Sequence, residues 1–230
     1  MRYVFRAALA ASAILLSAPA FAQVEEVVVT GSRMYEGPNA PNVTIVKRAD
    51  HLITTLRITC DTRDDDQRRE EIKTTLRGMM RAAAASRTIS LGQGDGVLVP
   101  LEESAFDDMI EPDSRPDTSR LYVVIKTTIS ADDTFATATR RIKDFIAAVP
   151  RAGRVEVLRD DRWDLTLIGP EQYREVLIRK IVEDASRTAA LFGASDGAAI
   201  DGLERPVAWY QKGPLDLALY IPYSLRIVPK

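Results

Sequence analysis

The stretch Leu121-Tyr-Val-Val-Ile-Lys-Thr-Thr-Ile-Ser130 is the clearest β-strand of the sequence. Side chains alternate along it with a period of two, which is typical of a strand that buries one face. The other face carries Tyr122 and Val124 and is expected to be half-buried. The buried face is expected to hold Leu121, Val123, Ile125, Thr127 and Ile129. We expect the fold to form around this strand.

An amphipathic helix is predicted directly after this strand, at residues 135–149, where apolar side chains recur at helical spacing. Asp132-Asp133 is expected to cap its start, and Pro150 is expected to end it. Two further long helices are predicted at residues 64–86, capped by the run Asp64-Asp65-Asp66, and at residues 171–192. The inner face predicted for the last helix comprises Val176, Leu177, Ile181, Ala185, Thr188, Ala189 and Phe192.

Pairs of short strands are predicted between these helices. They lie at residues 43–47 and 52–60, 88–91 and 97–101, 154–159 and 163–168, and 199–210 and 215–228. Turn residues are expected to join the last three pairs as hairpins. Residues 102–117 are expected to form a long exposed loop with one helical turn around Ala105 to Ile110. Hairpins between three long amphipathic helices predict an α+β fold with a largely antiparallel or mixed sheet.

The composition is that of a globular chain without a nucleic-acid footprint. The 230 residues are 46% apolar and 28% charged, with a net charge of −2. Nucleic-acid-binding surfaces are strongly basic, so this balance predicts no such partner. No segment after the N-terminus is apolar and long enough to span a bilayer. Cys60, the single cysteine, is expected in a core, and His51, the single histidine, is expected to be exposed. One residue of each type provides no internal disulfide and no ordinary zinc site, and no cofactor is expected.

The first 22 residues have the pattern of a secretory signal peptide. Arg2 and Arg6 precede an apolar run from Ala7 to Ala18, and Ala20-Phe21-Ala22 fits a cleavage site. The apolar run is shorter than the roughly 20 residues of a membrane-spanning helix. We therefore expect export to the periplasm, where the mature chain either is free or associates with the outer membrane.

A valine-rich segment follows the expected cleavage point and resembles the TonB-box region of TonB-dependent outer-membrane receptors. The resemblance implies an extended segment that pairs as an added strand with a TonB-like periplasmic protein. Its physics is that of strand addition, because valine favours an extended backbone. An ordinary first strand and an inert tail remain equally open. The candidate partner-binding residues are Glu25, Glu26, Val27, Val28, Val29, Thr30 and Gly31.

A Gly/Pro/Asn linker ends this segment at residue 42 and sets the expected organisation. Residues 1–22 are the signal peptide, residues 23–42 are the valine-rich segment with its linker, and residues 43–230 form a single α+β domain.

The chain from Val43 to Val228 resembles the SIMPL domain (DUF541) of exported bacterial proteins. The resemblance rests on the element order and on Asp184-Ala185, Ala189, Ala190 and Gly193 before a final extended strand. Ala152-Gly153 also matches the family's turn, whereas the family's glycine-rich first strand is absent and Arg187 replaces a usual lysine. The resemblance implies a periplasmic, non-catalytic protein that self-associates, in some members as a ring.

One motif of catalytic proteins occurs, at Gly193-Ala194-Ser195-Asp196-Gly197. The hydrolase elbow with this pattern follows a strand and precedes a helix, with its histidine later in the chain. Here a helix is predicted before it, and His51 lies far upstream, so we interpret the motif as a helix end and loop. The sequence therefore predicts a non-enzymatic periplasmic protein that acts through self-association or partner binding in the cell envelope. The alternatives are an accessory of the TonB system and, less favoured, a hydrolase.

Overall fold

A computed structural model describes residues 26–29 and 42–229 of the chain. Those residues form an α+β fold in which every pair of neighbouring strands is antiparallel. The strands are β1 (Glu26–Val29), β2 (Ile45–Arg48), β3 (His51–Cys60), β4 (Ile89–Gln93), β5 (Val99–Pro100), β6 (Glu111–Pro112), β7 (Ser119–Thr128), β8 (Val155–Arg159), β9 (Asp164–Ile168), β10 (Asp196–Asp201), β11 (Ala208–Gln211), β12 (Asp216–Tyr220) and β13 (Ser224–Pro229).

The helices of the same residues differ widely in length. They are α1 (Asp65–Ala85), α2 (Phe106–Met109), α3 (Phe135–Ala148) and α4 (Arg174–Ala190), with 3-10 turns at Glu103–Ala105 and Pro170–Tyr173. None of them is both long and apolar enough to cross a membrane. Residues 102–117 contain α2, where one helical turn is predicted, and the short strand β6. The prediction that this segment is exposed is wrong at Phe106 and Ile110, which are buried in the core.

The centre of the molecule is an eight-stranded sheet with β3 and β7 in the middle. Its order is β1-β9-β3-β7-β4-β5, with β8 paired to β3 and β6 paired to β7. β3 and β7 pair over ten residues, from His51 opposite Thr128 to Cys60 opposite Ser119. The alternation predicted for β7 is confirmed, because its odd-numbered side chains are buried. The opposite face is partly buried, with Tyr122 exposed and Val124 buried.

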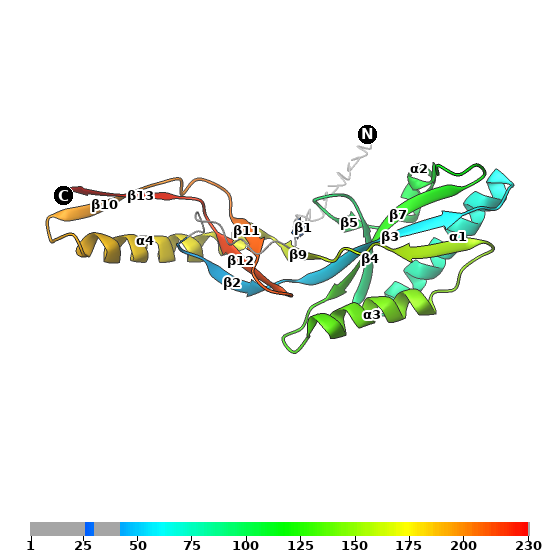
Figure 1. Cartoon of the computed structure of the whole chain (residues 1–230), viewed down its shortest axis with the longest axis horizontal. Helices are drawn as coiled ribbons and strands as arrows, with labels where there is room; N and C mark the ends of the chain where they lie inside the picture. The colour runs from blue at the N-terminus through cyan, green and yellow to red at the C-terminus, as the bar shows by residue number, and fades with distance from the viewer. Residues whose placement is uncertain (1–25, 30–41, 230) are drawn as a thin grey trace, which may run out of the picture.

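Helices α1 and α3 lie along one face of this sheet (Figure 1). Leu56 of β3, Leu76 of α1 and Ile142 of α3 are fully buried in the resulting core. We call this sheet with α1 and α3 the central region. As predicted, the Asp64 carboxylate caps α1, accepting a hydrogen bond from the Gln67 amide at 2.8 Å.

The cap predicted for α3 is wrong by one residue. Its N-cap is Thr134, whose hydroxyl accepts from the Thr137 amide at 3.1 Å, while the Thr137 hydroxyl accepts from the Thr134 amide at 2.9 Å. This reciprocal capping box satisfies two free amides at once, so the helix starts after Thr134. Asp133 is used instead in the turn that precedes the helix.

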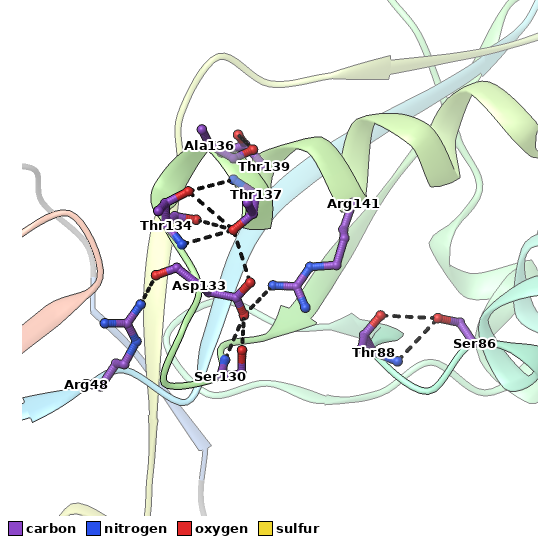
Figure 2. Close-up of polar contacts among 10 residues, drawn as sticks. All are labelled: Arg48, Ser86, Thr88, Ser130, Asp133, Thr134, Ala136, Thr137, Thr139 and Arg141. Atoms are coloured by element: carbon purple, nitrogen blue, oxygen red, sulfur yellow. Dashed lines mark hydrogen bonds and ion pairs between the residues drawn. The ribbon is translucent and has the colours of Figure 1, made fainter.

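A polar cluster around Asp133 joins this turn to β2 (Figure 2). Arg48 of β2 donates to the Asp133 backbone carbonyl. The Asp133 carboxylate accepts from the Ser130 amide at 2.7 Å and pairs with Arg141 at 2.6 Å. Burial raises the pKa of this carboxyl, but the surrounding donors outweigh burial and hold the pKa well below its usual value. The cluster therefore ties the beginning of α3 to a strand of another sheet.

The hairpin predicted for residues 154–168 is wrong. β8 pairs with Leu56–Cys60 of β3, and β9 pairs with His51–Ile53 of the same strand. The two strands therefore run in one direction along one edge of β3, with residues 160–163 bulging between them. The Thr54 hydroxyl holds this bulge by donating to the carbonyls of Asp160 and Arg162. Ten residues of β3 are long enough to accept both segments end to end, which local sequence does not reveal.

The C-terminal hairpin is confirmed and forms two ladders in succession. β11 pairs with β12 beside the turn, β10 pairs with β13 farther out, and β2 adds to β12. Pro222 falls in the break between β12 and β13, in keeping with the interruption predicted there. These strands and α4 form a second, elongated part of the molecule away from α1 and α3, which we call the α4 region (Figure 1).

Only one stripe of α4 is covered. Leu177, Ile181, Ala185 and Ala189 are buried, as predicted for its inner face. Val176 and Phe192 are exposed, so their assignment to that face is wrong. Leu177 and Ile181 of this stripe belong to a second hydrophobic core that also contains Leu165 and Leu167 of β9. The central sheet thus contributes to both cores.

Candidate functional site

Strand β1, formed by four residues of the valine-rich segment, lies inside the central sheet. One of its edges pairs with β9, from Glu26 opposite Ile168 to Val29 opposite Leu165. On its other edge the Val28 amide donates to the Gly96 carbonyl at 2.7 Å, and the Glu26 carbonyl accepts from the Leu98 amide at 3.1 Å. Both hydrogen-bonding edges of β1 are therefore occupied within the chain.

This position closes the strand order into a ring. The sheet runs from β1 to β5, and residues 96–98 just before β5 return to β1 through the pairing of Val27 with Val97. Val28 packs on one side of β1 against Ile53, Leu98 and Val124. Val27 points to the other side, into the second core. Without β1, the edges of β9 and of residues 96–98 would lack these partners.

The Glu26 carboxylate fixes β1 in this position. It is buried beside three donors from three different strands. Its Oε1 lies 2.7 Å from His51 Nδ1 on β3 and accepts from the Thr166 hydroxyl on β9 at 2.7 Å. Its Oε2 pairs with the Lys126 ammonium on β7. We call the β9 edge, residues 96–98 and these three side chains the β1 seat.

The electrostatics of the seat favour a charged glutamate. Burial raises the pKa of Glu26, but hydrogen bonds from His51, Lys126 and Thr166 together lower the pKa to about 2. A buried carboxylate is tolerated when opposite charge and donors surround it, and removing one partner leaves the rest uncompensated. The seat therefore selects a strand that carries an acidic side chain in this register.

The predicted partner-binding residues divide into two groups. Glu26, Val27, Val28 and Val29 form β1, whereas Glu25, Thr30 and Gly31 lie outside the described residues. The four described residues of this segment are extended, as predicted.

Sequence reasoning missed the residues that receive the strand. His51 was expected to be exposed, and this is wrong: its side chain is only 14% exposed because it faces Glu26. Lys126 and Thr166 lie 100 and 140 residues from Glu26 along the chain. The one available signal was the charged Lys126 within the half-buried face of an otherwise apolar strand.

A second feature lies at the far end of the α4 region. A groove of about 570 Å³ runs between the second half of α4 and β10. Val182 and Ile200 line it together with small residues including Ala189 and Gly197. Leu191 and Phe192, just after the helix, are 82% and 66% exposed. We call this groove and these two side chains the distal surface.

The groups considered for chemistry are dispersed. Ser195 lies in the turn after α4 and before β10, the reverse of the order in a hydrolase elbow, as the sequence predicts. Cys60 is buried as predicted, and its thiol donates to Glu71 at 3.2 Å. In the described residues, no three His, Cys, Asp or Glu side chains gather in a group suited to a metal ion.

No family model matches the chain, and no curated protein matches it.

Proposed function

We propose that the chain is an exported, non-enzymatic SIMPL-like protein that works in the cell envelope by assembling with copies of itself. The order of strands and helices supports the SIMPL-like assignment, together with the small residues of α4 that end at Gly193. The signal-peptide pattern of residues 1–22 supports export.

The distal surface is the observation that carries the assembly proposal. Leu191 and Phe192 project from the end of α4 beside an open groove with an apolar rim. Adjacent apolar projections and hollows of this kind are typical of interaction sites rather than of solvent-facing surface. A knob beside a groove also lets two copies bind reciprocally around a twofold axis, because each copy offers both parts.

Sizing chromatography with light scattering tests this proposal. We expect the unchanged chain to run as an oligomer and the double variant Leu191→Asp/Phe192→Asp to run as a smaller species. Leu158→Asp is the matched control, because Leu158 is also exposed, at 49%, but lies on β8 of the central region. A double variant with the mass of the unchanged oligomer would contradict the role of the distal surface.

The second candidate is an accessory of the TonB system, in which residues 25–31 dock on a TonB-like periplasmic protein. The resemblance of that segment supports it. The β1 seat adds a condition, since residues 26–29 must leave β9 before they can pair with another protein. Capture of the TonB C-terminal domain should therefore increase in Glu26→Ala, which weakens the seat, and vanish when residues 25–31 are deleted. Equal capture by all three chains would remove this candidate.

A further inference from the structure

We propose that β1 is an exchangeable strand: in the assembled protein, β1 of one copy occupies the β1 seat of a second copy, and the reverse. The inference rests on the proposed self-assembly and adds a second contact between copies to the one made by the distal surface. The occupant is residues 26–29 of an identical chain.

The contacts of β1 do not depend on which chain supplies it. They consist of the ladder to β9, the two backbone hydrogen bonds to residues 96–98 and the Glu26 cluster. An identical strand from a second copy reproduces each of them. Exchange of an identical element is for this reason a low-cost route to a dimer.

The seat is selective enough to make this exchange specific. A strand enters it correctly only if an acidic side chain meets His51 and Lys126 while the next residue enters the second core. A shift of the strand by one residue would turn the acidic side chain toward the second core. His51 and Lys126 would then lack their carboxylate partner. The valine-rich segment of a second copy meets this requirement because its sequence is identical.

The connection allows the strand to reach a neighbour. Fifteen residues, 30–44, separate β1 from β2. At about 3.3 Å per residue, a segment of that length spans up to about 50 Å when extended. That reach is comparable with the dimensions of a small domain, so a seat on an adjacent copy is within range.

A cysteine cross-link between two chains tests the exchange. Val27 and Val97 face each other as a non-hydrogen-bonded pair, because the flanking residues make the two hydrogen bonds. Such pairs have Cα atoms about 4.5 Å apart, within the range that a disulfide bridges. We would place Val27→Cys in one chain and Val97→Cys in another, both with Cys60→Ala, refold them together and oxidise them. We expect a disulfide between residues 27 and 97 of different chains, identified by mass spectrometry of the linked peptides.

Two controls show that the link reports the seat. Tyr122→Cys replaces Val97→Cys at matched exposure, 45% against 44%, on a distant part of β7. It should give at least ten-fold less link. Adding Glu26→Lys to the Val27→Cys chain should reduce the 27–97 link by at least ten-fold as well, because the Lys126 ammonium then repels the strand.

The outcomes separate the two proposals. Oligomers without any 27–97 link between chains would overturn the exchange and leave the assembly proposal standing, provided that one chain carrying both substitutions links internally. A monomer at every concentration, with the link confined to single chains, would overturn both.

Discussion

The central region and the far end of the α4 region, where β10 pairs with β13, bury their apolar side chains to very different degrees. In the central region, Leu76 of α1 and Leu121 of β7 are among many side chains that lie completely inside a core closed by two helices. In the α4 region, β12 and the first half of α4 share the second core, but no residue of β10 or β13 is fully buried. At this far end the helix lies on a two-stranded ribbon, which has too little area to enclose a core. The difference indicates that the central region encloses its apolar side chains, whereas the far end of the α4 region leaves part of its apolar surface uncovered.

The largest expected effect is the loss of Leu76 from the central region. Leu76→Ala leaves a cavity in a fully enclosed core and should lower the free energy of unfolding by about 2–5 kcal/mol. Ile200→Ala, in partly buried β10, should cost less than about 1 kcal/mol. Urea titration of both variants measures the two costs. Equal losses of unfolding free energy in the two variants would contradict the difference in burial between the two parts of the molecule.

The next effect concerns β1, which packs against both regions. The folded-state pKa of Glu26, about 2, lies below the ordinary value of 4.5 for a glutamate, so the charged form stabilises the fold. This contribution is fully present above about pH 4.5 and is lost as the pH falls toward 2. A shift of that size corresponds to on the order of 3 kcal/mol. Glu26→Gln should be less stable at neutral pH, with less loss between pH 5 and 2, in unfolding curves at each pH. Parallel pH profiles for the two chains would refute the assigned role of the carboxylate.

A smaller effect is expected at the turn after α3, where the central region is closely packed. Gly153 has φ +52°, and a Cβ there would lie 2.1 Å from the Glu71 carboxyl carbon. That carboxylate accepts from the Thr62 hydroxyl and the Arg154 amide, so it has little freedom to move. Gly153→Ala should cost about 1–3 kcal/mol.

Gly96→Ala is the control for this turn, because Gly96 has φ +81° with no atom within 4 Å of the added Cβ. It should show backbone strain alone and a smaller loss of thermal stability. Equal losses would mean that the Glu71 contact is unimportant.

The elements of the fold could largely be predicted, but their partners could not. Periodicity located β3, β7, α1 and α3 because each buries a whole face or stripe, and burial leaves a local pattern. The pairing of β8 and β9 with one strand depends on the length of β3, which is a property of distant residues. For the same reason Val176 and Phe192 were assigned to a covered face of α4, since periodicity does not tell how much of a helix a neighbour covers.

The candidate site shows the same limit more strongly. The extended backbone of Glu26–Val29 follows from its valines. The seat does not, because His51, Lys126 and Thr166 come from three strands and meet only in the folded sheet. A single histidine in a polar turn has no local feature that distinguishes an exposed side chain from the partner of a buried acid.

The position of β1 also determines when the fold can be finished. β1 precedes its ladder partner, which ends at Ile168, by more than a hundred residues. Contacts separated by so much chain form slowly, because a large loop must close before they contribute. Until then the edges of β9 and of residues 96–98 remain open to other strands, including those of other copies. In the proposed exchange, the last step of folding therefore competes with the first step of assembly for the same edge, and the local concentration of copies decides the outcome.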